Sequence, residues 1–235
     1  MVNKFHLKAL SWDSNFFSQK IAQLSFDDTS KCMSSLNDFD LVQTKTATNN
    51  YSEINKLNQL GFHLAEGEID FIIAIKKTVL TSSPDKITIA TAQDIEQIRE
   101  IANGSFLMSR YRKPWFNADK RDEFYQIWAE KAVKGTFDDL CLIIKTANIV
   151  TGFITLKIEG KSARIGLIAV NKSYKGQGIG SNLLKHAQYY CQEKNITQLF
   201  VATQLANNIA VSLYSKFGFS PNSLSYWFYK THDPI

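Results

Sequence analysis

The chain is poor in cysteine, with only Cys32, Cys141 and Cys191 among 235 residues. Their number is odd, they are far apart, and they form no metal-binding pattern with the four histidines. We therefore expect reduced, buried thiols, no bound metal and a cytoplasmic protein. Long apolar runs are also missing, and residues 1–8 lack the apolar core of a signal peptide, which predicts no membrane span.

Blocks of like charge are missing as well. The 27 Lys and Arg residues exceed the Asp and Glu residues enough to give a net charge of +5, but they are dispersed along the chain. We therefore expect no nucleic-acid partner, although the excess positive charge suits a small anionic ligand. The proportions of 44% hydrophobic and 21% charged residues predict a globular protein with one domain or two modest ones.

Glycine is limited to 11 residues, yet three of them fall close together, at Gly176, Gly178 and Gly180. The apolar run from Ile165 to Val170 before them predicts a buried strand, and the spacing after them predicts an amphipathic helix. Backbone N–H groups at such a helix start bind phosphate well. The run lacks the Gly-Lys-Ser/Thr end of a P-loop and the full GxGxxG spacing, so it is another phosphate site or an ordinary turn.

A second informative segment follows that helix. Residues 198–203 predict another buried strand, and residues 207–219 read Asn-Asn-Ile-Ala-Val-Ser-Leu-Tyr-Ser-Lys-Phe-Gly-Phe. This segment resembles the GNAT acetyltransferase motif Asn-x-x-Ala-x-x-Leu-Tyr-x-Lys-x-Gly-Phe at every specified position. The glycine-rich run resembles the pyrophosphate loop of the same family, Arg/Gln-x-x-Gly-x-Gly/Ala, with Lys175 as a departure in the first place. The resemblance covers roughly residues 85–235.

The GNAT resemblance implies an α/β (α+β) fold with a central, mostly antiparallel sheet that splays where the coenzyme enters and is flanked by helices. It also implies acetyl-CoA as the cosubstrate and no metal. The pyrophosphate would bind the amides of the glycine-rich loop, and the pantetheine arm would pair along the end of the preceding strand. The cofactor-binding residues that it implies are Ile168, Ala169, Val170, Lys175, Gly176, Gln177, Gly178, Ile179, Gly180, Ser181 and Asn207.

The chemistry of acetyl transfer sets the roles of the other residues. An amine attacks the thioester carbonyl, an oxyanion develops, and backbone N–H groups around Ile168 would stabilise it. The resemblance places the hydroxyl of Tyr214 near the thioester sulfur, where a phenol can protonate the leaving thiolate. The alternative is that Tyr214 is a core aromatic beside Leu213 and Phe217. Neither motif contains a cysteine, so we expect direct attack without a covalent intermediate.

A general base is harder to identify. Some family members have a Glu on the strand before the pyrophosphate loop, but residues 162–170 contain no acid. Glu159 lies at the end of the preceding strand, where a solvated turn residue is the simpler interpretation. Either water carries the proton away, or the attacking amine has a lower pKa than lysine. An amino group on a sugar ring fits the second case, because neighbouring oxygens withdraw charge.

The chain divides near Thr81–Asp85, a short polar stretch that contains a proline. We expect residues 84–235 to form the GNAT domain and residues 1–83 to form an N-terminal subdomain. The hydrophobic patterns predict further elements within the GNAT domain. They are strands at 87–90, 140–145 and 150–158 and helices at 94–103 and 119–134.

The N-terminal subdomain contains a weak internal repeat. When residues 41–75 are shifted by 157 positions, Asn50 falls on Asn207, and the pair Gly61-Phe62 falls on Gly218-Phe219. We interpret the segment as a degenerate half-GNAT unit of strand, helix and strand that extends the sheet and walls the acceptor site. It has Leu57 at the position of Tyr214 and no phosphate loop, so it is not expected to bind coenzyme A. Chance similarity is the alternative.

A loop between the two predicted helices, residues 105–116, combines three cations with four large aromatic residues. In the family this loop lies over the acceptor side of the cleft, and its composition suits a ligand with phosphates and a ring. The alternative is that its aromatic residues pack onto the sheet. The candidate substrate-binding residues are Arg110, Tyr111, Arg112 and Trp115.

Three short segments, residues 10–17, 109–115 and 134–138, resemble the sugar-nucleotide branch of the bacterial GNAT enzymes. With them the resemblance spans nearly the whole chain. It implies a small-molecule acceptor, the 4-amino group of dTDP-4-amino-4,6-dideoxygalactose, used for surface glycans such as enterobacterial common antigen. The alternatives are another amine (a protein N-terminus, a polyamine or an aminoglycoside) or a non-catalytic coenzyme A sensor. A homodimer is left open.

Overall fold

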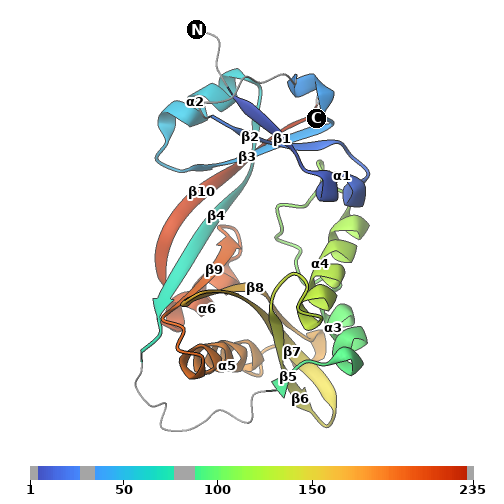
Figure 1. Ribbon diagram of the computed structural model, residues 1–235, viewed down its shortest axis with the longest axis vertical. Coiled ribbons are helices and arrows are strands. Elements are labelled where there is room, and N and C mark those ends of the chain that lie inside the picture. Colours follow the sequence, from blue (N-terminus) through green and yellow to red (C-terminus); the bar gives the residue numbers. More distant parts are fainter. Residues whose placement is uncertain (1–4, 27–34, 77–87, 232–235) are drawn as a thin grey trace.

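The computed structural model describes residues 5–26, 35–76 and 88–231. They form one ten-stranded sheet in the order β1-β2-β3-β10-β4-β9-β8-β7-β6-β5, in which β4 and β10 run along the length of the molecule (Figure 1). The strands are β1 His6–Ala9, β2 Ile21–Ser25, β3 Leu41–Ala47, β4 His63–Ala74, β5 Thr88–Ile89, β6 Leu140–Thr146, β7 Ile149–Glu159, β8 Ser162–Val170, β9 Gln198–Gln204 and β10 Ser220–Thr231. The helices are α1 Ser11–Phe17, α2 Tyr51–Gln59, α3 Ile95–Ala102, α4 Ala118–Val133, α5 Ile179–Glu193 and α6 Asn208–Lys216.

The elements predicted from residue 94 onward are present, with ends that differ by a few residues at most. The predicted strand at 87–90 is shorter, because only Thr88 and Ile89 pair with β6. The predicted linker Thr81–Asp85 and the thiol of Cys32 lie outside the described residues.

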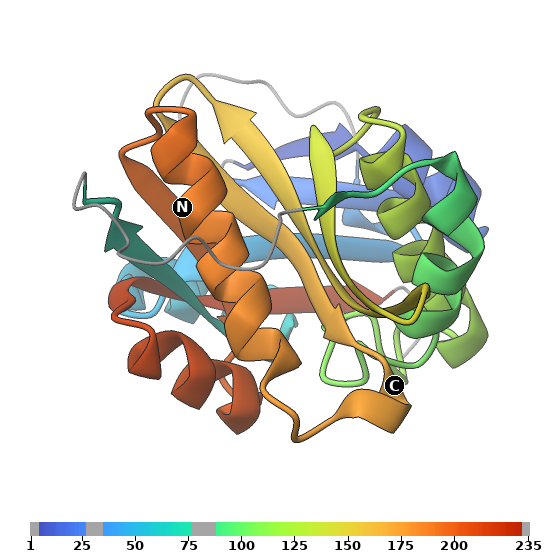
Figure 2. The same ribbon diagram turned by 90° about the horizontal axis from the view of Figure 1, so that it is seen from below.

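Helices cover both faces of the sheet. Figure 2 shows α5 on one face and α3 and α4 on the other. The core is divided accordingly. Leu183 and Leu184 of α5 pack against Ile165 of β8 in one cluster, and Ile98 of α3 and Phe124 of α4 belong to the cluster on the opposite face. The two faces of the sheet are therefore buried by different helices.

The sheet is mostly antiparallel, as predicted, and it splays between β8 and β9. These two strands are parallel and pair only where residues 162–165 meet residues 198–201. Beyond that point β8 stays paired with β7 as far as Val170, and β9 stays paired with β4 as far as Gln204. The C-terminal ends of β8 and β9 therefore separate and leave one edge of β8 open.

The predicted strand–helix–strand unit in the N-terminal half is observed. Every bound of β3, α2 and β4 lies 157 residues before the corresponding bound of β9, α6 and β10. Asn50 and Asn207 each accept a hydrogen bond from the N–H three residues later. Gly61 and Gly218 have φ values of 77° and 81°. The same local conformations therefore recur at the same spacing in both halves.

The two units interlock through a symmetric strand pairing. β10 lies between β3 and β4, and β4 lies between β10 and β9. Glu68 and Ser225, which correspond under the shift, face each other at the centre of the β4–β10 pair. Bulges at Ala65 and Asn222 also correspond. The sheet passes through both halves without a break, and a domain boundary at residue 83 stays a prediction.

Candidate active site

The predicted phosphate loop lies between β8 and α5. Gly176 and Gly178 have φ values of 79° and 77°, a left-handed conformation that favours glycine. The first hydrogen bond within α5 joins the Asn182 N–H to the Gly178 carbonyl at 3.0 Å. The N–H groups of residues 179–181 therefore precede the helical ladder and face the helix N-terminus. Lys175 and Gln177 are exposed beside them, so an anion can reach this point.

The open edge of β8 presents backbone donors. The Asn171 N–H donates to a carbonyl of β7 at 2.9 Å, and the Leu167 N–H donates to the Thr155 hydroxyl of β7 at 2.8 Å. Alternate residues of a strand direct their N–H groups to opposite edges. The N–H groups of Ile168 and Val170 therefore point toward the gap between β8 and β9, where the oxyanion and the pantetheine arm were predicted.

A β-bulge precedes this edge. Ile165 pairs with Leu156 and Ile168 pairs with Ile154, so residues 166 and 167 share one partner position on β7. The bulge exchanges the two faces of β8: Ile165 packs in the α5 cluster, whereas Ala169 packs in the α3–α4 cluster. The bulge thus sets which side chains and which N–H groups face the gap.

Tyr214 lies on the buried face of α6, with 3% of its surface exposed. Its ring centroid lies 5.8 Å from those of Phe71 and Phe219, and its cluster includes Ile168 and Val170 of the open β8 edge. The ring of Tyr214 therefore packs in the core, as the alternative interpretation predicted. Burial raises the pKa of the Tyr214 hydroxyl, which keeps this group protonated at neutral pH and able to donate.

Asn207 caps α6. Its Oδ1 accepts the Ala210 N–H at 3.2 Å, and its Nδ2 donates to the Thr203 hydroxyl at 3.2 Å. Both ends of the amide are therefore held by the protein itself, and contact with the coenzyme arm stays a prediction.

Arg110 joins the 105–116 loop to the N-terminal half. Its guanidinium lies between two rings, 3.9 Å from the Trp227 centroid and 4.2 Å from that of Tyr111. It donates to Gln43 Oε1 at 2.8 Å and to the hydroxyls of Tyr229 and Tyr111 at 2.5 and 2.6 Å. These contacts fix the loop over β3 and β10.

The aromatic residues of this loop largely pack inward, as the alternative interpretation held. Tyr111 and Trp115 are 9% and 7% exposed, and Trp115 packs edge-on against Tyr229 at 5.2 Å. The indole N–H of Trp115 is buried and finds no acceptor among the described residues. Arg112 donates to the Ala65 carbonyl at 2.7 Å. Substrate contact by these residues stays a prediction.

Charged side chains line the sheet face opposite α5. Alternate residues of β4 share this face, and each carboxylate has a cationic partner: Glu68 with Lys45 at 2.5 Å and Asp70 with Arg164 at 2.6 Å. Glu66 lies 3.8 Å from Arg112. The predicted acceptor side therefore alternates in sign and is not uniformly basic.

An apolar pocket of about 370 Å³ lies between α1 and α4. Trp12 and Phe137 are 46% and 50% exposed at this pocket, and the Lys131 ammonium lies 5.1 Å from the Trp12 ring. The pocket is lined by Trp12, Asp13, Tyr111, Phe124, Ile127, Trp128, Lys131 and Phe137. Such a surface can hold a planar ring or the C–H face of a sugar.

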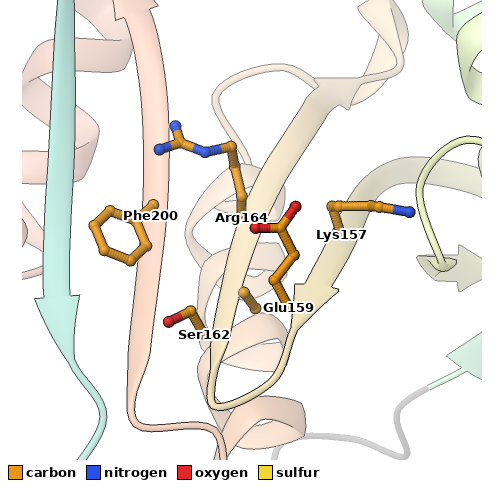
Figure 3. A pocket seen from close by; sticks show the side chains of 6 residues that line it. Lys157, Glu159, Ser162, Arg164 and Phe200 are labelled. Carbon is orange, nitrogen blue, oxygen red and sulfur yellow. The ribbon is translucent and has the colours of Figure 1, made fainter.

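A smaller groove of about 210 Å³ lies where β7, β8 and β9 meet. Figure 3 shows Glu159 and Lys157 on one side of it and Arg164 and Phe200 on the other. Glu159 is exposed at the end of β7, as predicted. The guanidinium of Arg164 is 5.4 Å from the Phe200 ring and is held by Asp70. The exposure of Glu159 in this groove agrees with its interpretation as a solvated turn residue.

Sequence reasoning missed Asp138, a buried acid close to β8. Its Oδ2 accepts hydrogen bonds from the Thr155 hydroxyl at 2.5 Å and from the Trp128 indole N–H at 2.8 Å. A Cβ added at Gly166 would lie 2.3 Å from this oxygen. The available signal was its place in the Lys134–Asp138 segment, which carried part of the family resemblance but no assigned role.

Within the described ranges, no cluster of His, Cys, Asp or Glu side chains could hold a metal ion. The same residues include no helix with the length and hydropathy to cross a membrane. Cys141 and Cys191 are buried free thiols, and burial raises the pKa of the Cys191 thiol to about 12.

Backbone donors along an open strand edge beside a buried phenol are suited to acyl transfer, and comparison with known proteins agrees. The model of the Acetyltransferase (GNAT) family matches residues 95–219, which is more than half of the chain. The chain belongs to this family and is an acyl-CoA-dependent N-acetyltransferase. Its fold, a large mixed sheet flanked by helices, is the GNAT fold.

Among curated proteins, the chain is similar to dTDP-fucosamine acetyltransferase of Escherichia coli O6:H1, with 33% identity over 95% of this chain and 97% of the relative. It is 27% identical to a streptothricin acetyltransferase of Escherichia coli over 54% of this chain and 66% of that one. A solved tandem GNAT protein from the clavulanic acid biosynthesis pathway superposes with a TM-score of 0.60, covering 92% of this chain and 76% of that protein at 10% identity. This last likeness concerns the fold alone.

Proposed function

We propose that the protein transfers the acetyl group of acetyl-CoA to the 4-amino group of a nucleotide-linked amino sugar, dTDP-4-amino-4,6-dideoxygalactose. The observation that carries this proposal is the 33% identity to dTDP-fucosamine acetyltransferase over 95% of the chain. This likeness includes the N-terminal half, which the GNAT family model does not cover. A whole-chain likeness supports a shared acceptor more strongly than a likeness limited to the coenzyme motifs.

We place acetyl-CoA in the gap between β8 and β9. The pyrophosphate lies on the amides of residues 175–181, and the pantetheine arm pairs along residues 168–170. In this arrangement the Ile168 N–H meets the oxyanion, and the protonated hydroxyl of Tyr214 donates to the leaving thiolate. The family's use of acetyl-CoA supports this placement, and so do the N–H groups at the start of α5, which have no side-chain cap among the described residues.

We place the acceptor on the opposite face, with a ring in the pocket between α1 and α4. The exposed faces of Trp12 and Phe137 offer stacking area, and Lys131 offers a cation for a phosphate oxygen. The exposed Lys113 adds a second cation on the same loop as Arg110. The sugar amine then reaches the thioester from the α4 side of the sheet.

We place the reaction in the cytoplasm, in keeping with the free thiols of Cys141 and Cys191. A role in surface glycans such as enterobacterial common antigen follows from the acceptor that we propose. A homodimer belongs to the same proposal and awaits a measurement of mass in solution.

The test is to incubate the protein with acetyl-CoA and dTDP-4-amino-4,6-dideoxygalactose, following free thiol and the mass of the sugar nucleotide. Gain of one acetyl group, with one thiol released for each, is the expected result. Binding of acetyl-CoA without any turnover of this acceptor, in a preparation that acetylates another amine, would contradict the proposed acceptor.

A cationic acceptor is the second candidate, and the carboxylates on β4 favour it. Glu66, Glu68 and Asp70 share one face, and the streptothricin acetyltransferase is a relative over half of the chain. Polyamine and aminoglycoside acceptors distinguish the two candidates, since a site that selects cationic acceptors would acetylate them faster than the anionic sugar nucleotide.

A further inference from the structure

The strand that precedes the phosphate loop carries no acid, yet a carboxylate lies against it. Asp138 precedes β6 and is 3% exposed. Both of its hydrogen bonds, from Thr155 and Trp128, are accepted at Oδ2. Its Oδ1 accepts none within the part of the chain that the structure describes. The two donors thus fix the carboxylate and leave one oxygen available.

The carboxylate of Asp138 can approach β8 because residue 166 is a glycine and has no side chain. A Cβ at Gly166 would lie 2.3 Å from Asp138 Oδ2 and 2.9 Å from the Thr155 hydroxyl. Asp138 therefore occupies the space that a side chain of residue 166 would fill. Residue 166 belongs to the bulge, two residues before the Ile168 N–H that faces the gap. The fold thus delivers an acid from another element to the reacting end of β8.

The carboxylates of β4 on this side of the sheet are held by cations. Glu68, Asp70 and Glu66 have Lys45, Arg164 and Arg112 as partners. Asp138 has no ion pair within the described residues, and burial raises its pKa, an effect that the bonds from Thr155 and Trp128 partly offset. A carboxylate with a raised pKa is a stronger base than an ordinary aspartate.

We propose that Asp138 is the general base that takes the proton from the attacking amine. The proposal rests on the N-acetyltransferase activity and not on the identity of the acceptor, because every amine acceptor must lose a proton. The proposal thus gives the role of general base to a residue outside β8, because β8 itself contains no acid.

The step balances as follows. The nitrogen lone pair of the neutral amine forms the C–N bond at the thioester carbonyl, and one N–H proton passes to Asp138. The C–S bond breaks, its electron pair leaves with the coenzyme A sulfur, and Tyr214 protonates that sulfur. Solvent then takes the proton from Asp138 and returns one to Tyr214. The net change is amine plus acetyl-CoA to amide plus coenzyme A.

The test compares Asp138→Asn with Asp139→Asn. An asparagine oxygen can still accept from Thr155 and Trp128, but an amide cannot take the amine proton. Asp139 is the adjacent, exposed acid, and it accepts the Ile158 N–H at 2.6 Å. We expect D138N to lower kcat by about 100-fold or more, with acetyl-CoA affinity within twofold of the native value. D139N is expected to keep kcat within threefold.

Stability separates catalysis from a structural role. Because the pKa of Asp138 is raised in the folded state, its ionised carboxylate lowers the free energy of unfolding at neutral pH. The free energy of unfolding recovers as the pH falls through the folded pKa and the carboxylate is protonated. D138N should therefore melt at the same temperature as the native protein or higher at pH 7. A lower melting temperature for D138N would assign Asp138 to structure and overturn the proposal, as would a kcat within threefold of native.

The pH profile gives a second readout. Protonation of the amine and of Asp138 both contribute to the acid side of the native kcat/KM profile, so D138N should lose one of the two ionisations. The charged or titratable groups that face Asp138 are Lys157 of β7, the neighbouring Asp139 and the Cys141 thiol of β6. D139N tests the influence of the neighbouring acid. Its kcat/KM profile should keep the ionisations of both the amine and Asp138. An unchanged profile in D138N would overturn the proposal.

These comparisons use any amine that the native protein acetylates. Failure of the sugar nucleotide as acceptor and failure of Asp138 as base are therefore separate results.

Discussion

At the scale of single residues, backbone groups and one phenol do most of what the coenzyme requires. The Ile168 N–H and the N–H groups at the start of α5 depend on chain conformation and not on side-chain identity. Tyr214 is different, because its hydroxyl is the only part of it that aromatic packing does not explain. Phe71 and Phe219 contact the ring alone.

Tyr214→Phe keeps this packing and removes the hydroxyl. We expect kcat to fall by tenfold or more, with little change in acetyl-CoA affinity, because the lost proton donor acts on the leaving thiolate. Steady-state kinetics with acetyl-CoA titration measure both quantities. Because burial raises the pKa of Tyr214, no alkaline loss of activity below about pH 10 should come from this group. An unchanged kcat would remove Tyr214 from the mechanism.

Gly178 and Gly180 form a matched pair in the phosphate loop. Gly178 has a φ of 77°, so alanine there costs about 1 kcal/mol and disturbs the amides. A Cβ at Gly180 would lie 3.6 Å from Leu213 Cδ2, an ordinary contact within a helix. We expect G178A to raise the Kd for acetyl-CoA roughly tenfold and G180A to leave it unchanged. Isothermal titration calorimetry measures both Kd values, and equal affinities of G178A and G180A for acetyl-CoA would contradict the prediction.

At the scale of elements, the repeat separates structural roles from functional ones. Asn50 and Asn207 cap α2 and α6 in the same way. The cap therefore explains an asparagine in both copies without any ligand. A coenzyme contact is expected only of Asn207, which follows β9, the strand across the gap from β8.

Asn50→Ala and Asn207→Ala test this distinction. Each variant should lose about 1 kcal/mol of unfolding free energy, the usual cost of losing an N-cap. Only N207A should also raise the KM for acetyl-CoA. Denaturant unfolding and steady-state kinetics measure the two effects. A KM for N207A equal to that of N50A would limit Asn207 to capping.

Element-scale patterns also explain what the sequence could predict. The strand, glycine turn and helix around residues 165–184 are fixed by local spacing, and so are the elements of the repeat, because each rests on residues a few positions apart. Asp138 and Arg110 could not be assigned in this way. Asp138 reaches β8 across β7, and Arg110 meets Trp227 and Gln43, which are distant in the sequence. Such contacts depend on strand order, which no local pattern contains.

At the scale of the whole molecule, the interlocked strands join the two halves. Phe17 and Leu41 of the N-terminal half share a core cluster with Phe124 and Leu167 of the C-terminal half. Removing the C-terminal half would leave β4 with no partner strand on either side, and removing the N-terminal half would do the same to β10.

We therefore expect one cooperative unfolding transition for the full chain. Far-ultraviolet circular dichroism and tryptophan fluorescence should give coincident denaturant curves, because the two halves share one sheet and one core. Two separated transitions would show that the halves unfold independently and would favour a boundary near residue 83.

The central claim is that this whole molecule acetylates a sugar amine carried by a nucleotide. The most direct measurement compares kcat/KM for dTDP-4-amino-4,6-dideoxygalactose with that for the same amino sugar without its nucleotide. If the nucleotide contributes binding, the ratio should be about 100 or more, which corresponds to about 2.7 kcal/mol. Equal values, or faster acetylation of the free amine, would contradict the account.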